Sequence, residues 1–335
     1  MTKSDLVAYA VALPKAELQL HIEGTLEPEM MLSLAQRNKT DIPHATVDDI
    51  RTAYQFSHPQ QFVEIYQQSQ QVLRTEEDFF DLTMAYLNRS CAHNVRHAEI
   101  SFSPQGHMAR GVTFNTVVGG ILTALSLAKM QFGMSTSLIM NVSSQLSEDN
   151  ALDVMHHAEP WLEQITGISL SLANAEQSPA KFTSLFQTAH DRDLKSVVQF
   201  DHDSAATQIS ETLDQFNVNR IGCGSRILKD DALLERLVGR EIGMTVSPLS
   251  GALLTAEGST LTYPLKNMLE RALPVTINSN VPAFLGGYML DNFKAIIDGS
   301  ELSFGDVKRL VKNSFTSSFL PEGQKRAQLA AVDLV

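Results

Sequence analysis

Residues 14–24 read Pro14-Lys15-Ala16-Glu17-Leu18-Gln19-Leu20-His21-Ile22-Glu23-Gly24 and contain the first of the strands that decide the fold. Seven more short runs that are typical of strands follow along the chain: Arg96–Phe102, Thr136–Asn141, Gly167–Leu172, Ser196–Phe200, Arg220–Cys223, Met244–Ser247 and Val275–Asn278. Most are followed by a stretch of helical period, such as Asp230–Arg240 after the sixth strand. Together with Glu17–Ile22, these runs predict an α/β fold, a (β/α)8 TIM barrel.

The stretch between the first two strands departs from this alternation. Residues about 25–94 contain apolar spacings that indicate helices, as in Phe62-Val63-Ile65-Tyr66 and Phe79-Phe80-Leu82-Met84. We expect this helical insertion to lie over the C-terminal mouth of the barrel as a lid, although packing against the barrel side is equally open. Because no repeat or Pro/Ser-rich linker divides the chain, residues 1–335 are expected to form a single domain.

Composition limits the classes of partner and the compartment. The net charge of -12 argues against nucleic acid or an anionic membrane, since both attract basic surfaces. Two cysteines are too few for a disulfide framework and fit a reducing cytoplasm. The apolar run Leu6–Leu13 is too short to span a membrane, and Asp5 makes it a poor secretion signal. We therefore predict a cytoplasmic protein.

Polar residues stand at the C-terminal ends of several predicted strands. They are Gln19 and His21 from the first, Gln199, Asp201, His202 and Asp203 from the fifth, Cys223 from the sixth, Ser247 from the seventh, and Asn278, Ser279 and Asn280 from the eighth. Reactive groups of TIM barrels lie at these strand ends, so we expect the side chains to converge on one pocket.

Two long stretches carry a family resemblance. Leu13–Glu29 resembles the opening of adenosine and adenine deaminases, which are zinc hydrolases on a (β/α)8 barrel, and Val275–Tyr288 resembles their eighth-strand signature. Thr245–Ser250 and Arg220–Gly224 stand where the seventh- and sixth-strand motifs belong. The adenine deaminase branch is indicated by two further runs, Phe102–His107 and Leu146–Asp149. The resemblance covers nearly the whole chain.

The resemblance implies four positions for zinc ligands, and this chain departs from the family at three of them. The family has His-x-His, a further His and an Asp, whereas the residues here are Gln19, His21, Gln199 and Asn280. Neutral amide oxygens are weak donors to zinc, which prefers imidazole, thiolate and carboxylate. We therefore expect no bound cofactor and no metal at these four positions.

The resemblance also implies catalytic and substrate-binding positions. His202 stands where the family has its proton-shuttling Glu, and Cys223 stands where a His steadies the attacking hydroxide. Four further positions are implied for substrate binding: Gly24, Asn174, Asn280 and Val281. Val281 replaces an Asp that contacts the purine, and Asn174 replaces an acidic contact after the fourth strand.

These substitutions lead to the expectation of a pseudoenzyme that has lost zinc and purine deamination but keeps a pocket for a purine-like ligand. One alternative is an active hydrolase or aminohydrolase on a purine or related heterocycle, by residual chemistry or by a repurposed Cys223/His202 pair. A second is an interaction protein with a plugged pocket, acting as a homo- or hetero-oligomer.

Two further alternatives concern the polar residues themselves. Gln19, Gln199 and Asn280 match the lost ligands in size and can hydrogen-bond one another as a plug. His21 is either a hydrogen-bonded core histidine or a ligand in a new metal site. Asp201, His202 and Asp203 form either a solvated loop tip or the start of a replacement metal site with His21 and Cys223.

Overall fold

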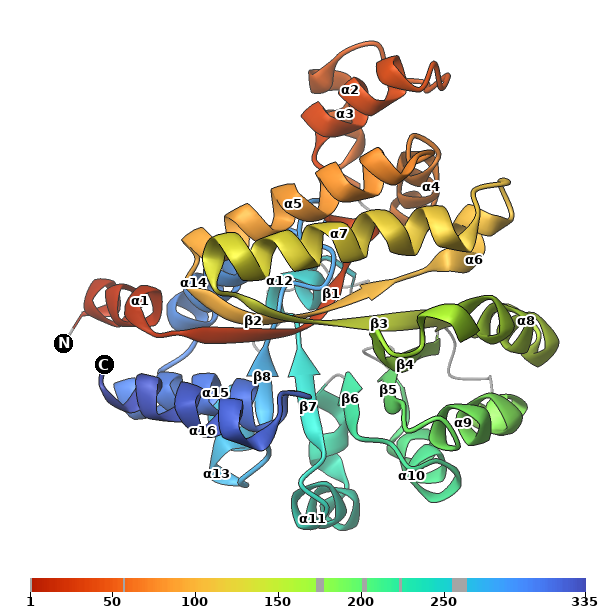
Figure 1. Ribbon diagram of the computed structural model, residues 1–335. Helices are drawn as coiled ribbons and strands as arrows, with labels where there is room; N and C mark the ends of the chain where they lie inside the picture. Colours follow the sequence, from red (N-terminus) through yellow and green to blue (C-terminus); the bar gives the residue numbers. More distant parts are fainter. Residues whose placement is uncertain (1, 57, 173–177, 201–203, 223–224, 255–263) are drawn as a thin grey trace.

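Eight parallel strands form one sheet in the order β1 to β8 (Figure 1). The structure is a computed structural model that describes residues 2–56, 58–172, 178–200, 204–222, 225–254 and 264–335. The strands are β1 Lys15–His21, β2 Val95–Phe102, β3 Ser135–Ser143, β4 Ile165–Leu172, β5 Lys195–Phe200, β6 Arg220–Gly222, β7 Gly243–Val246 and β8 Val275–Ile277. All the predicted strands are therefore confirmed with small shifts at their ends, and so is the TIM-barrel fold.

The first and last strands meet at the C-terminal end of the sheet. A parallel bridge joins Leu20 to Asn280. The Asn280 amide N–H donates to the Gln19 carbonyl at 3.0 Å, and the Asn280 carbonyl accepts from the His21 N–H at 2.9 Å. These contacts bring β1 beside β8, so that the sheet curves into a barrel.

Helices surround the strands and include the one predicted at Asp230–Arg240, which is α11. Their bounds are α1 Lys3–Ala12, α2 Pro28–Arg37, α3 Val47–Ala53, α4 Pro59–Gln70, α5 Glu76–Ala92, α6 Pro104–Met108, α7 Phe114–Phe132, α8 Glu148–Ala158, α9 Thr183–His190, α10 Ala206–Gln215, α11 Asp231–Gly239, α12 Pro248–Leu254, α13 Leu265–Glu270, α14 Met289–Gly299, α15 Phe304–Thr316 and α16 Glu322–Asp333. Short 3-10 helices are η1 Ile22–Thr25, η2 Glu159–Trp161, η3 Pro179–Phe182 and η4 Ser225–Lys229. None of the helices in these described ranges is long and apolar enough to cross a membrane.

The stretch between β1 and β2 contains helices α2 to α5. Figure 1 shows α5 lying along α7, whereas α2 and α3 project away from the barrel. Aromatic rings join this stretch to the segment after β8: Tyr54 stacks on Phe284 with ring centroids 4.1 Å apart, and Tyr66 meets the same ring edge-on at 5.4 Å. Helix α4, which carries Tyr66, therefore packs beside the segment that follows β8.

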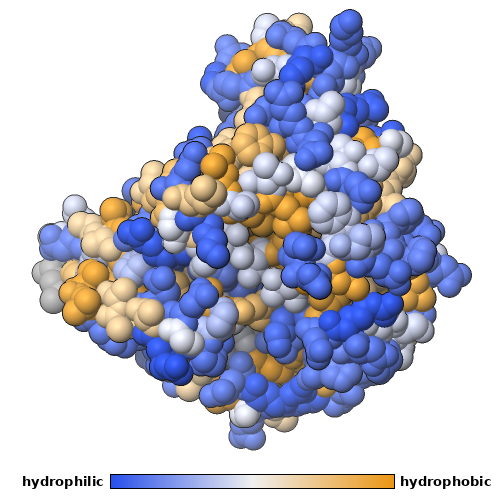
Figure 2. All heavy atoms as spheres, viewed as in Figure 1, coloured by the Kyte–Doolittle hydropathy of each residue, from blue (hydrophilic) through white to orange (hydrophobic). Residues whose placement is uncertain are grey.

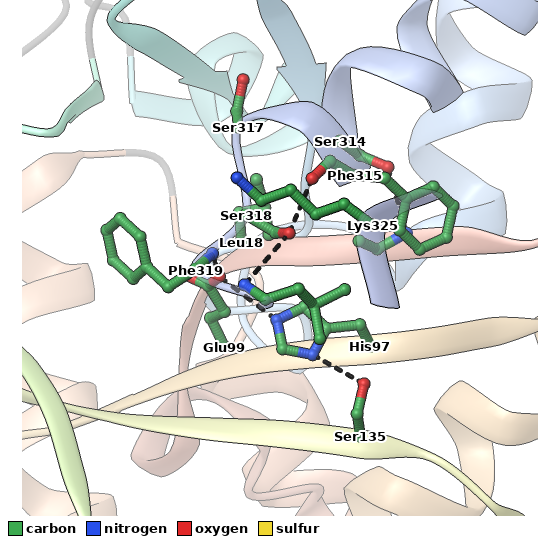
Figure 3. A network of polar contacts seen from close by, with 12 residues as sticks. Leu18, His97, Glu99, Ser135, Ser314, Phe315, Ser317, Ser318, Phe319 and Lys325 are labelled. Carbon is green, nitrogen blue, oxygen red and sulfur yellow. Dashed lines mark hydrogen bonds and ion pairs between the residues drawn. The ribbon is translucent and has the colours of Figure 1, made fainter. Parts of the chain in front are cut away.

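The N-terminal end of the barrel holds a buried polar network, which we call the floor network (Figure 3). Its members are His97, Glu99, Ser135, Arg220 and Phe319. Arg220 lies at the start of β6 and donates to Glu99 Oε2 on β2 at 2.5 Å. Glu99 Oε1 accepts from the Phe319 amide at 2.5 Å and from His97 Nε2 at 3.2 Å. The network thus ties β2 and β6 to the segment that follows α15.

Candidate functional site

The imidazole of His21 lies at the C-terminal end of β1 and contacts strand β5. Its Nε2 is 3.1 Å from Gln199 Oε1. Strands β1 and β5 are far apart in the strand order, so this bond crosses the mouth of the barrel. Burial lowers the pKa of His21, while the Gln199 hydrogen bond and the negative charge of Glu23 act in the opposite direction. With the amide oxygen of Gln199 facing the ring, a neutral His21 has its proton on Nε2.

The main chain of Asn280 is held in a left-handed conformation directly after β8. Its φ is 64°, a region that Asn tolerates better than most residues. Its main-chain bonds to Gln19 and His21 hold this conformation in place. Sparsely populated backbone conformations gather at functional sites, which agrees with the place of Asn280 beside the candidate residues.

The predicted plug, in which Gln19, Gln199 and Asn280 hydrogen-bond one another, is wrong. Gln199 bonds to the imidazole of His21 instead of to another amide. Gln19 Oε1 is buried and has no hydrogen-bond partner among the described residues. Asn280 contacts β1 through its main chain. The prediction that His21 is a hydrogen-bonded buried histidine agrees with its exposed fraction of 8%.

Gly24 and Val281, two predicted substrate-binding residues, lie against each other. A Cβ built on Gly24 would stand 2.4 Å from Val281 Cγ1, so no larger residue fits at position 24 without movement of the chain. The Gly24 carbonyl also accepts from the Ala283 amide at 3.0 Å. The segment after β1 is thereby fixed to the segment after β8 at the mouth.

Several predicted site residues lie outside the described residues. These are Asn174, Asp201, His202, Asp203 and Cys223. The catalytic roles predicted for His202 and Cys223, the substrate contact predicted for Asn174 and the replacement metal site all stay predictions. Two cavities, of about 290 and 360 Å³, lie elsewhere: one is lined by residues of α6 and α7, the other by residues of α9 and β5.

Sequence reasoning missed Glu23, which is fully buried in η1 two residues after His21. Glu23 Oε1 accepts from the Ser103 amide at 2.7 Å and from His107 Nε2 at 3.3 Å, whereas Oε2 has no partner among the described residues. Burial alone would raise the pKa of Glu23, but the His107 and Ser103 contacts lower it on balance. The signal available in the sequence was an acidic residue directly after the first strand, on the same side of the barrel as the Ser103–His107 run.

Unpartnered polar atoms gather at strand ends on the C-terminal side of the barrel. Gln19 Oε1 lies on β1, Glu23 Oε2 lies in η1 directly after β1, and Ser247 Oγ follows β7. A buried polar atom without a hydrogen bond is costly, and proteins contain few of them. These three atoms have no partner among the described residues, and we call them the mouth atoms.

The four positions implied for zinc offer one imidazole and three amides. Gln199 Oε1 is already engaged with His21 Nε2, and Gln19 Oε1 is neutral. As a set these residues do not fit the zinc centre implied by the family resemblance, since zinc prefers imidazole, thiolate and carboxylate ligands. Across the part of the chain that the structure describes, no three His, Cys, Asp or Glu side chains gather into a metal-binding group.

Comparisons with known proteins now identify the family. The adenosine deaminase family model matches residues 14–335. An adenine deaminase from Sphingopyxis alaskensis is 44% identical over 326 residues, which cover 97% of this chain and 96% of that protein. The crystal structure of an adenine deaminase from Arthrobacter aurescens matches with a TM-score of 0.92 at 39% identity, covering 96% of this chain and 99% of that chain.

A solved amidohydrolase from Burkholderia ambifaria, with bound Zn, shares the fold alone. Its TM-score is 0.89 at 22% identity, and the match covers 98% of this chain and 92% of that chain.

These comparisons correct two expectations. The pseudoenzyme interpretation is wrong, because the proteins that match nearly the whole chain at 42–44% identity are adenine deaminases. The expectation of no cofactor is contradicted as well, because the family that matches nearly the whole chain is metal-dependent. The expectation of no cofactor rested on the four positions implied for zinc, and the pseudoenzyme interpretation rested on the substituted catalytic and substrate-binding positions as well. Residues 201–203 and 223–224, which follow β5 and β6, lie outside the described residues.

The family match runs from residue 14 to the last residue and includes the strand ends discussed above. The relatives are covered almost completely in return, at 96% and 99% of their length. The chain belongs to the adenosine deaminase family, in its adenine deaminase branch.

Proposed function

We propose that this protein is an aminohydrolase that acts on a purine base or a related heterocycle at the C-terminal mouth of the barrel. The observation that carries the proposal is the 44% identity to an adenine deaminase over 97% of this chain. The geometry supports it, because the mouth atoms are buried, and without partners among the described residues, where TIM barrels hold their substrates.

The proposed reaction replaces an amino group by oxygen. Water adds at the ring carbon that bears the amino group, ammonia leaves, and the carbon keeps the oxygen of the water. The step needs groups that move protons between the water, the ring and the leaving amine. Our candidates are His202 and Cys223, since the resemblance puts them where the family has its acid/base groups. Asn280, Gly24, Val281 and Asn174 are our candidates for contacts to the base.

The proposal assigns no step to a metal, because the donors at positions 19, 199 and 280 are amides. Whether the activity depends on a metal is measured by assaying the protein with added zinc and with a chelator. We further propose that residues 1–335 form a single domain and that residues about 25–94 act as a lid over the mouth. We also propose that the protein works in the cytoplasm and binds no nucleic acid. These proposals rest on the sequence pattern and on the net charge of -12. Homo- or hetero-oligomerisation is a further part of the proposal, and gel filtration with light scattering tests it.

The test is release of ammonia from adenine, adenosine and other aminopurines by the purified protein. The protein is assayed as isolated, after addition of zinc and after treatment with a chelator, and its metal content is measured in each state. We expect ammonia and the matching oxopurine in equal amounts. The absence of ammonia from every compound in all three states would overturn the proposed function.

Matched variants assign the roles. His202→Asn is compared with His156→Asn, because the His156 side chain is 75% exposed on α8. Cys223→Ser is compared with Cys91→Ser in the last turn of α5. A general acid or base contributes on the order of 100-fold to the rate, so His202→Asn should lower kcat by that order while His156→Asn leaves it unchanged. Full activity of Cys223→Ser would exclude the thiol.

A further inference from the structure

Strand β1 has an irregular register with β2 just before the mouth of the barrel. Glu17 pairs with Ala98. The next pair is Leu20 with Ile100, so three steps along β1 match two steps along β2. One extra residue in a strand forms a β-bulge. Because side chains alternate between the two faces of a strand, the extra residue reverses the faces on which the following side chains lie.

The side chains before and after this bulge point in different directions. Before it, Glu17 Oε2 accepts from the Tyr86 hydroxyl at 3.0 Å, on helix α5 outside the barrel (Figure 1). After it, His21 contacts strand β5, and Gln19 Nε2 is 3.4 Å from a Cβ built on Gly222 of β6. Both contacts cross the interior of the barrel, since neither strand is a neighbour of β1. Gln19 and His21 therefore face inward, although each is an even number of residues from the outward-facing Glu17.

Side chains bind both main-chain groups of Leu18 inside the bulge. The Leu18 N–H donates to Asn278 Oδ1 at 2.8 Å, and the Leu18 carbonyl accepts from Arg220 Nη2 at 3.1 Å. A buried main-chain group that leaves the regular ladder of a sheet needs another partner. Asn278 and Arg220 supply these partners and so stabilise the bulge. Arg220 also belongs to the floor network, whereas Asn278 stands directly after β8.

The side-chain amide of Asn278 is fully buried and fixed in one orientation. Its Nδ2 donates to Thr276 Oγ1 at 3.0 Å and to the Thr276 carbonyl at 3.2 Å. An NH2 group only donates, so Oδ1 is the atom that faces the Leu18 N–H. The Asn278 N–H donates in turn to the Val246 carbonyl of β7 at 2.9 Å. The side chain thus binds β1 instead of entering the pocket that the strand ends were expected to form.

We propose that Asn278 is a positioning residue for the mouth of the barrel. By holding the bulge at Leu18, it keeps the side chains of Gln19 and His21 turned into the barrel. Without the bulge, the residues after Leu18 would shift by one position, and both side chains would turn toward the outer helices. The inference rests on the proposed function for the use of this mouth, and it adds a residue that acts through β1 without touching the substrate.

Nitrogen NMR of protein labelled at histidine tests the position of His21. In wild type the ring is bonded to Gln199, and Gln199→Leu gives the reference signal of a His21 ring without this bond. Asn278→Leu keeps a side chain of similar size but removes the acceptor for the Leu18 N–H. Its His21 signal should therefore move from the wild-type position toward that of Gln199→Leu. Asn278→Asp keeps the acceptor and should stay near the wild-type position.

A milder variant decides the case in which Asn278→Leu does not fold. Thr276→Val keeps the shape of the side chain and removes the Oγ1 acceptor that orients the Asn278 amide. Its His21 signal should move in the same direction by a smaller amount. Thr212→Val on α10 is the matched control, because this buried threonine donates to the Gln208 carbonyl of its own helix. The control should leave the His21 signal unchanged.

Ammonia release from adenine measures the consequence for the proposed reaction. Displacement of groups in an active site by about 1 Å can lower the rate about 100-fold. We therefore expect kcat to fall roughly 10- to 100-fold in Asn278→Leu. Asn278→Asp should keep most of the activity, and Thr212→Val should keep all of it.

The two measurements separate this inference from the proposed function. A wild-type His21 signal in folded Asn278→Leu overturns the inference. If that variant does not fold, an unmoved His21 signal in Thr276→Val overturns it. If the signal moves as expected but wild-type protein releases ammonia from no aminopurine, the role of Asn278 is supported and the proposed function is overturned.

Discussion

The floor network and the mouth atoms occupy opposite ends of one barrel and differ in how their polar groups are satisfied. In the floor network both oxygens of Glu99 accept hydrogen bonds, and Arg220 also donates to the Leu18 and Ser317 carbonyls at 3.1 Å each. Arg220 Nε is its one atom without a partner among the described residues. At the mouth, Gln19, Glu23 and Ser247 each keep an atom that has no partner in the described part of the chain.

This difference separates stability from function along the barrel axis. Groups at the N-terminal end of a TIM barrel serve the fold, and groups at the C-terminal end serve the ligand. The floor network should therefore be sensitive to the loss of any partner. The mouth should tolerate replacement of an unpartnered group, or gain stability from it, and should lose ligand binding instead.

The largest expected effect is at the floor. Arg220→Met leaves the Glu99 carboxylate buried without its cation, which costs about 3–5 kcal/mol of the free energy of unfolding. Denaturant unfolding followed by circular dichroism measures this loss. The control is Arg271→Met, whose ion pair with Asp231 is at the surface and should contribute less than about 1 kcal/mol. Equal losses in the two variants would remove the distinction between a buried and a surface pair.

A smaller effect of the floor network is its dependence on pH. Burial acts to raise the pKa of Glu99, but the Arg220 charge and the His97 contact lower it on balance. A depressed folded pKa adds stability above the unfolded value of about 4.5, and this stability is lost as pH falls through the folded value. Unfolding curves of wild type should therefore weaken more steeply below that pH than those of Glu99→Gln. If the free energies of unfolding of wild type and Glu99→Gln fell equally steeply below that pH, this role of Glu99 would be contradicted.

The smallest expected effect on stability is at the mouth. Gln19→Met removes a buried amide oxygen that has no partner among the described residues and keeps a side chain of similar length. Replacing an unsatisfied group by an apolar one is neutral or stabilising, so we expect a change between zero and a gain of about 1 kcal/mol. Thermal unfolding measures it. A loss of more than 2 kcal/mol, on the order of a buried hydrogen bond with its partner left unsatisfied, would show that Gln19 is paired in solution.

The fold was predictable because strand periodicity is a local property of the sequence. Each of the predicted strands is present. Runs such as Ser196–Phe200 are apolar because a parallel strand is buried on both faces of its sheet, and this composition can be recognised in the sequence. The site was less predictable. Predicting the His21–Gln199 contact requires the order of the strands in the barrel as well as the sequence. Glu23 was missed because its partners come from the segment after β2. The expected loss of function was wrong because individual residue identities were given more weight than similarity along the whole chain.

The central claim is that the mouth of the barrel carries out aminohydrolysis of a purine base. Its most direct test is incubation of the protein with adenine in water enriched in heavy oxygen, with ammonia and product measured together by mass spectrometry. We predict equal amounts of ammonia and of an oxopurine that contains one labelled oxygen. Unchanged adenine and no labelled product, with or without added zinc, would contradict the claim.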